Sequence, residues 1–236
     1  MTRVIGRWVP QELARLETLD AAVNAVAERY DFASHPYFRW LASDAATRGA
    51  FRDSQLPFRF AVEAFSQCLA AVLARTPQLE RRMGLAANVA EEHGEGSLER
   101  SHKHTFEGFL RALGATEDHL ALGCPVEVLA FDRALLDHCL VERPEVGAAT
   151  LGIVEHLYVD ISRVIAERIL ARGWVEPSGQ DHYRVHERLD VVHAEDLFTI
   201  ARPGWRSEHL RPDVARALAL GAHHFWSLYA GLLPDD

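Results

Sequence analysis

The sequence predicts an all-α protein. Along most of the chain, apolar residues recur every three or four positions, which is the period of an amphipathic helix. Prolines and glycines separate these stretches, at places where they end one helix or begin the next. β-branched residues are few, and none alternate with polar residues over a useful length, as a half-buried strand requires. We therefore expect a bundle of helices without a sheet.

In the first half of the chain, the apolar pattern predicts four helices. They cover residues 10–30, 38–42, 57–74 and 77–89. Prolines at positions 10, 57 and 77 begin three of them, because the fixed φ angle of proline suits the first helical turn. The fourth helix ends before two nearby glycines, Gly94 and Gly96, which mark a break.

Five more helices are predicted in the second half. The first begins at Ser97, a capping residue just ahead of an acid, and ends at Gly114. The others cover residues 125–139, 144–173, 186–200 and 212–232, with a loop over residues 176–180. Because the turns are short and the helices carry apolar faces, we expect antiparallel neighbours around one core.

The composition fits a single domain over residues 1–236. Hydrophobic residues make up 48% of the 236 residues and charged residues 25%, as in ordinary globular proteins. No solenoid repeat and no Gly/Ser-rich or Pro-rich linker divides the chain. The net charge of -9, without any block of Lys and Arg, argues against a nucleic-acid partner.

The location follows from the cysteines and from the apolar runs. The three cysteines, Cys68, Cys124 and Cys139, are far apart and form no CxxC pair, so we expect small buried hydrophobes and not disulfides or a zinc site. The N-terminus lacks the apolar core of a signal peptide, and no apolar run approaches the length that spans a bilayer. We therefore expect a cytoplasmic protein without a membrane partner.

The chain is organised around the stretch from His186 to His193. In a helix, His186, Asp190 and His193 lie within one narrow arc, which Leu189 and Leu197 extend toward a core. Two imidazoles and a carboxylate are costly to bury without compensation, and a metal ion is the simplest compensation. The alternative is a surface helix whose polar face carries two of the 13 histidines.

Three more polar side chains, Glu92, His102 and Glu155, interrupt apolar stripes on three other predicted helices. His102, for example, shares a face with Leu98 and Phe106. Taken alone, each has an ordinary explanation, as a core histidine, a solvated helix end or a partner for a buried arginine. Together with the stretch from His186 to His193, they supply three carboxylates and three imidazoles from four helices. This is the set that a dinuclear iron or manganese site requires.

The order of these motifs in the chain resembles that of a known family, the heme-oxygenase-like diiron oxidases and oxygenases. This is the non-heme iron branch of the fold shared with the TenA thiaminases and the pyrroloquinoline-quinone synthase PqqC. The resemblance extends from about residue 58 to the C-terminus. The matching pieces are Asn88–Gly94 with Glu91 and Glu92, His102 with Phe106 and Arg111–Gly114, Glu155, the motif His186-x3-Asp190-x2-His193, and the aromatic segment His224–Tyr229.

The resemblance implies a heme-oxygenase-like seven-helix bundle that holds two Fe2+ ions, or manganese, and activates O2. The ligands it implies are Glu92, His102, Glu155, His186, Asp190 and His193. Three other carboxylates are candidates to assist. Glu99 is favoured among them because it would lie one turn before His102 on the same helix, whereas Glu95 and Glu63 are weaker candidates.

The resemblance also implies N-oxygenation, desaturation or carbon–carbon cleavage of an amino acid or a fatty-acid-like molecule. A carboxylate on that substrate would pair with Arg59 or Arg163, and Tyr158 is a candidate pocket residue. A homodimer is common in the fold. Two alternatives stay open: a cofactorless or hydrolytic enzyme of the TenA/PqqC type, and a metal-binding module without turnover. None of the three cysteines has the acidic and tyrosine-containing setting of the TenA nucleophile.

Overall fold

The structure, a computed structural model, describes residues 10–176 and 181–234. Every regular element in these two ranges is helical, which confirms the all-α prediction. The α-helices are α1 (Pro10–Leu13), α2 (Leu19–Arg29), α3 (Pro36–Ala42), α4 (Arg48–Gln55), α5 (Phe58–Arg75), α6 (Leu79–Glu92), α7 (His102–Ala112), α8 (Glu117–Leu120), α9 (Val126–Val141), α10 (Pro144–Ala171), α11 (Asp181–Arg206) and α12 (Arg211–Gly231).

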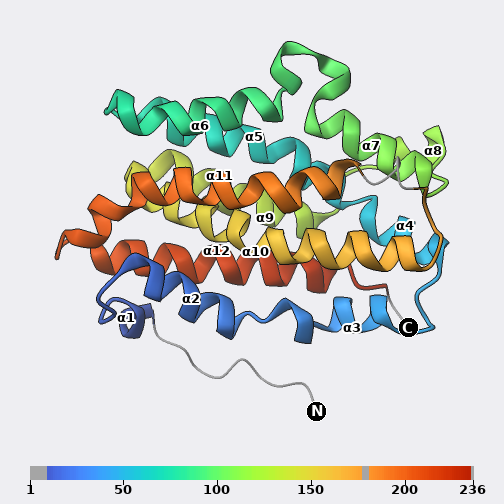
Figure 1. Ribbon diagram of the computed structural model, residues 1–236, viewed down its shortest axis with the longest axis horizontal. Coiled ribbons are helices and arrows are strands. Elements are labelled where there is room, and N and C mark those ends of the chain that lie inside the picture. Colours follow the sequence, from blue (N-terminus) through green and yellow to red (C-terminus); the bar gives the residue numbers. More distant parts are fainter. Residues whose placement is uncertain (1–9, 177–180, 235–236) are drawn as a thin grey trace.

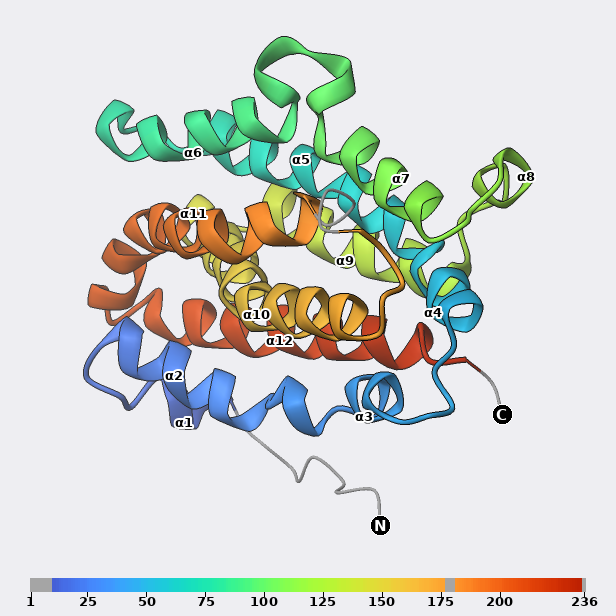
Figure 2. The same ribbon diagram turned by 45° about the vertical axis from the view of Figure 1, so that its right-hand side comes forward.

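The two longest helices, α10 and α11, form the centre of the bundle. They pack against each other more extensively than any other pair, and α12 lies along α10 (Figure 1). In both views, α6 and α7 lie on one side of this centre, whereas α2 and α3 lie on the opposite side, next to α12 (Figure 2). α5 packs on α9 and also contacts α6 and α7. Helices from distant parts of the sequence therefore surround the core formed by α10 and α11.

The first half of α10 is buried on nearly all sides. All ten residues from Val146 to Glu155 are buried, and most of them are small or aliphatic. At Gly152, an added Cβ atom would lie 2.7 Å from the Phe198 ring, so the glycine allows α11 to approach α10 closely. This approach brings Glu155, one turn further along α10, against the face of α11 that carries Asp190.

Nine residues connect α6 to α7 and form a loop that projects from the bundle (Figure 1). Gly94, Glu95 and Gly96 all have positive φ angles. At Gly94 a Cβ atom would lie 2.5 Å from backbone atoms of Arg100 and Ser101, so only glycine fits there. This tight loop brings the last residue of α6, Glu92, next to the first residue of α7, His102.

Two predicted helices have different boundaries in the structure. The helix expected over residues 10–30 is interrupted after α1, and α2 begins behind Thr18, whose hydroxyl accepts a hydrogen bond from the Ala21 N–H at 3.1 Å. The helix expected from Ser97 begins only at His102, because residues 98–100 form a separate 3-10 turn. Leu98 is consequently 71% exposed and does not belong to the apolar stripe of His102.

The remaining predicted helices are confirmed to within a few residues, except that α11 begins and ends beyond the predicted range of 186–200. The short helices α4 and α8 were not predicted, because four to eight residues are too few for a periodic pattern. The loop expected over residues 176–180, and the N-terminal residues considered for a signal peptide, lie mainly outside the described residues.

One described segment, Arg48–Arg75, is long and apolar enough to cross a membrane by length and composition. The expectation that no such run exists is therefore wrong. Most of the segment is α5, which buries residues such as Phe58, Leu69 and Val72 in the bundle. Its contacts with α9 and α6 account for this apolar face.

Candidate metal centre

The six ligand-type residues predicted from the sequence meet in the interior of the bundle. Glu92 ends α6, His102 begins α7, Glu155 lies on α10, and the remaining three residues lie on α11. All six side chains are buried: Glu92, His102, Glu155, His186, Asp190 and His193. Buried carboxylates and imidazoles normally need a partner of opposite charge or a metal, so this cluster requires an explanation.

Three of these residues form what we call the carboxylate-rich position: Glu155, Asp190 and His193. One ligand atom from each lies within 4.8 Å of the others. His193 Nδ1 is 3.6 Å from Asp190 Oδ1 and 4.0 Å from Glu155 Oε1. The Asn88 amide donates to Glu155 Oε1 across 3.5 Å and so helps to orient that carboxylate.

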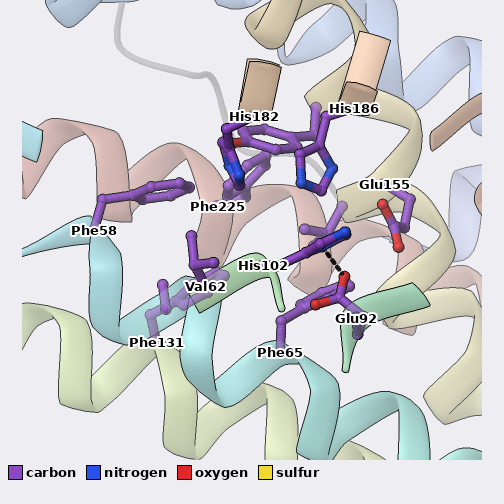
Figure 3. A pocket seen from close by; sticks show the side chains of 13 residues that line it. Phe58, Val62, Phe65, Glu92, His102, Phe131, Glu155, His182, His186 and Phe225 are labelled. Carbon is purple, nitrogen blue, oxygen red and sulfur yellow. Dashed lines mark ion pairs between the residues drawn. The ribbon is translucent and has the colours of Figure 1, made fainter. Parts of the chain in front are cut away.

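The other three form what we call the histidine-rich position: Glu92, His102 and His186. Glu92 Oε1 lies 2.9 Å from His102 Nδ1, and the centroids of the His102 and His186 rings are 4.6 Å apart (Figure 3). His186 Nδ1 also lies 2.9 Å from Asp190 Oδ1, which links the two positions. Of the two groups, only the carboxylate-rich position brings one ligand atom from every member within 4.8 Å of the others, so the histidine-rich position is the more open of the two.

Two of these buried atoms, His186 Nε2 and Asp190 Oδ2, have no hydrogen-bond partner. His102 Nδ1 and His193 Nδ1 face carboxylates, Glu92 Oε1 at 2.9 Å and Asp190 Oδ1 at 3.6 Å. Most buried polar atoms in proteins are satisfied, and leaving one unsatisfied costs about 1–3 kcal/mol. One divalent cation at each position would ligate these atoms, and carboxylate oxygen with neutral imidazole is a donor set that iron and manganese accept. The residues present therefore fit a metal.

The pKa shifts within the cluster also indicate a site that could bind a cation. Burial, followed by the charge of Asp190, raises the pKa of Glu155 well above its ordinary value. Burial opposes protonation of His193, but its hydrogen bonds with Asp190 and Glu91 and the charge of Glu155 outweigh this and raise its pKa to about 9. Without a cation the cluster holds protons in place of one, and metal binding would release them.

Glu91, which the sequence analysis matched to the family without giving it a role, contacts the cluster. Its Oε2 atom lies 2.9 Å from His193 Nε2, across 102 positions of the chain. With its Nε2 facing Glu91, the His193 ring keeps Nδ1 directed at the carboxylate-rich position. Carboxylates that hold metal-bound histidines in this way orient the ring and raise its basicity.

An apolar pocket opens beside the histidine-rich position. One end is formed by Glu92, Glu155 and the histidines, as seen in Figure 3. The rest of the wall is hydrocarbon, from Phe58, Ala61, Val62, Phe65, Phe131, Val154 and Phe225. A molecule bound in this pocket would lie against the ligand-type residues.

Of the three residues predicted to contact substrate, Tyr158 lines this pocket. Arg59 follows Phe58 on α5 and points about 100° away from it, since a helix turns by that angle per residue. Its guanidinium is held by the backbone carbonyl of Leu122, beside a different pocket. Arg163 lies on the outer side of α10, where it pairs with Asp160 at 2.9 Å. The structure thus brings neither arginine to the apolar pocket.

The three additional carboxylates also lie outside the centre. Glu63 pairs with Lys103 Nζ at 2.8 Å on the surface, and Glu95 lies 3.4 Å from Arg100. Glu99 is exposed in the 3-10 turn before α7 and accepts a hydrogen bond from Ser97. The reason for preferring Glu99 was a shared helix with His102, which the structure does not contain.

His182 is a residue that the sequence analysis missed. It lies one turn before His186 on α11, is 4% exposed and lines the apolar pocket. Burial and then the neighbouring His186 and His102 lower the pKa of His182 well below its ordinary value, so the ring is neutral. A signal was present, because His182 continues the i, i+4 spacing of His186 and Asp190 backward by one turn.

Solved structures of other proteins share the fold of this chain. A TenA homologue from Pseudomonas syringae pv. tomato has a TM-score of 0.70 with 14% identity, covering 94% of this chain and 91% of that one. A domain of unknown function with a heme oxygenase-like fold from Shewanella denitrificans has a TM-score of 0.74 with 15% identity, covering 91% of each chain. At these identities the likeness shows the fold alone, and it confirms the predicted heme-oxygenase-like bundle.

Sequence comparison identifies the family. No curated protein matches the chain significantly. A family model described as iron-containing redox enzyme matches residues 57–228, which is well over half of the chain and includes all six ligand-type residues. The protein belongs to this family of iron-containing redox enzymes.

Proposed function

We propose that the protein is a non-heme diiron oxidase or oxygenase that uses O2 to oxidise a small organic substrate. The observation that carries the proposal is the cluster of six buried ligand-type side chains, of which Glu92, His102, Glu155 and His186 form one end of an apolar pocket. A structural zinc site would more often be closed by cysteine and histidine. Here carboxylates predominate at one position, and one end of the pocket leads directly to the ligand-type residues.

The residues have separable roles in this proposal. Bound iron would supply the redox chemistry and the activation of O2. Glu92, His102 and His186 would hold one cation, and Asp190 and His193 the other. Glu155 is suited to lie between them, because its carboxylate takes part in the charge interactions of both groups. The aromatic wall excludes water from the reacting end of the substrate.

The pocket favours a substrate with an apolar portion. Its described lining contains no lysine or arginine, so a charged substrate group would have no cationic partner there. A fatty-acid-like chain or another hydrocarbon group therefore fits better than the charged end of an amino acid. Desaturation or carbon–carbon cleavage of such a group belongs to the reaction classes that we expect, along with N-oxygenation. We expect this small-molecule reaction to take place in the cytoplasm, without nucleic acid or membrane.

The alternative function is a cofactorless or hydrolytic enzyme of the TenA type. This alternative stays open because the TenA homologue from Pseudomonas syringae shares the fold. It requires a nucleophile, and none of the three cysteines lines the pocket; Cys68 and Cys139 are buried elsewhere. Its activity would be insensitive to chelators, whereas that of a diiron enzyme would be lost. A metal-binding module without turnover would instead retain metal and consume no O2.

The test is an anaerobic titration of the metal-free protein with Fe2+, followed by rapid mixing with O2. We expect two irons per chain, O2 consumption and a transient optical change. The variants His186→Ala and Glu155→Ala should each lose tight binding of at least one iron. His156→Ala is the matched control, since His156 lies beside Glu155 on α10 and does not line the pocket. Full iron occupancy in both test variants would contradict the ligand assignment, and a parallel Mn2+ titration decides between the two metals.

A further inference from the structure

The inference concerns His182, which no part of the proposed ligand set uses. Its ring lies within the same cluster as the histidine-rich position, with its centroid 4.4 Å from that of His186 and 6.1 Å from that of His102. Figure 3 shows the three rings around one end of the pocket. The Nε2 atom of His182 is buried and has no hydrogen-bond partner.

The hydrogen bonds around His182 define its tautomer. The Thr105 hydroxyl donates to the backbone carbonyl of His102 at 3.1 Å, so its proton is already used. The same oxygen lies 3.5 Å from His182 Nδ1 and is left to accept a hydrogen bond. The proton of the neutral ring is therefore on Nδ1, and the lone pair is on Nε2.

We propose that His182 is a further metal ligand, through Nε2, at the histidine-rich position. A buried lone pair without a donor is otherwise unexplained, and Thr105 holds the ring in the tautomer that a ligand needs. This inference rests on the proposed metal site.

The ring separations agree with such a site. With a metal–nitrogen bond of about 2.1 Å, two imidazoles bound at right angles to one cation have their centroids about 4.5 Å apart. The separations of His186 from its two neighbours are 4.4 Å and 4.6 Å. The centroids of His102 and His182 are 6.1 Å apart, so His186 lies between the two rings.

A fourth ligand makes the two positions chemically different. The histidine-rich position then offers three imidazole nitrogens and the Glu92 carboxylate, while the other position offers two carboxylates and His193. Imidazole suits iron and zinc, whereas carboxylate suits manganese. With both metals present, manganese should enter the carboxylate-rich position first.

The experiment uses Co2+ as the probe and treats each position separately. His193→Ala removes a ligand from the carboxylate-rich position, and His102→Ala removes one from the histidine-rich position. Adding His182→Phe to the His193→Ala protein should lower the affinity for Co2+ at the remaining, histidine-rich position by at least about tenfold and shift the visible absorption bands of that Co2+. Adding it to the His102→Ala protein should change the affinity for Co2+ at the remaining, carboxylate-rich position by no more than about twofold. The loss of a metal ligand produces a larger change than this.

The chain supplies a matched control. His138 Nδ1 lies 3.0 Å from the Thr150 hydroxyl, which donates to the carbonyl of Val146, so it repeats the arrangement of His182 and Thr105 away from the pocket. His138→Phe should leave both Co2+ sites unchanged. If His182→Phe fails to fold, His182→Gln replaces it. NMR spectra of the Zn2+-loaded protein with isotope-labelled histidines test directly whether His182 Nε2 binds metal.

The outcomes separate the two proposals. Unchanged Co2+ affinity and spectrum on adding His182→Phe to His193→Ala would overturn the role of His182 and leave the diiron proposal standing. A wild-type protein that binds neither Co2+ nor Fe2+ would overturn both proposals.

Discussion

The protonation of His193 predicts an unusual pH dependence for the metal-free protein. The pKa of His193 is raised from 6.5 to about 9 in the folded state, so the folded protein binds this proton more tightly than the unfolded chain does. The resulting stabilisation is complete below pH 6.5 and is lost as the pH rises toward 9. The metal-free protein should therefore become less stable over this range.

The size of the effect follows from the pKa shift. One pKa unit corresponds to about 1.4 kcal/mol, so His193 contributes on the order of 3 kcal/mol. Solvent screening reduces this little, because the His193 side chain is only 4% exposed and faces Glu91, Asp190 and Glu155. A change of this size is a large fraction of the stability of a typical domain.

Urea unfolding of the chelator-treated protein, followed by circular dichroism at several pH values, measures this loss. His193→Gln cannot be protonated, so it should remove most of the slope between pH 6.5 and 9. His156→Gln should keep the wild-type slope, because burial lowers the pKa of His156 and its ring is neutral throughout this range. Excess Co2+ should reverse the slope, since a cation binds only the neutral imidazole. An equal slope in wild type and His193→Gln would refute the reasoning.

Two further predictions concern positioning and packing. Glu91→Gln should lower the affinity for Co2+ at the carboxylate-rich position, whose His193 it orients, by about 10–100-fold in a metal titration. Glu95→Gln, at an exposed pair four positions away, should have no effect, and equal losses in both variants would contradict the positioning role. Gly152→Ala should destabilise the fold by about 1–3 kcal/mol in thermal or urea unfolding, because its Cβ would lie 2.7 Å from the Phe198 ring. Gly108→Ala, with no atom within 4 Å of the new Cβ, should instead stabilise α7 by up to about 1 kcal/mol, and a loss there would show that close packing is not the cause.

Much of the helical architecture follows from local sequence. α5, α9 and α10 begin at or directly after a proline, as predicted, and continue for as long as the apolar period lasts. The errors are local as well. Ser97 looks like a helix start, but the positive φ angles at Gly94 to Gly96 turn the chain so that the helix begins only at His102.

The candidate metal centre was also predicted only in part from local sequence. Spacing on one helix is enough to place His186, Asp190 and His193 on a common face, because helical hydrogen bonds connect residues only four positions apart. Glu92, His102 and Glu155 were recognised as inward-facing residues of other helices. That they meet these three depends on the turn after α6 and on the close packing of α10 against α11.

Only the tertiary structure decided the contacts that cross the bundle. Glu91 reaches His193, Thr105 defines the tautomer of His182, and Arg59 is drawn away to the carbonyl of Leu122. Each of these contacts joins residues more than 60 positions apart. Helical periodicity is set by hydrogen bonds within one helix, whereas the meeting of side chains from different helices is set by how their surfaces pack.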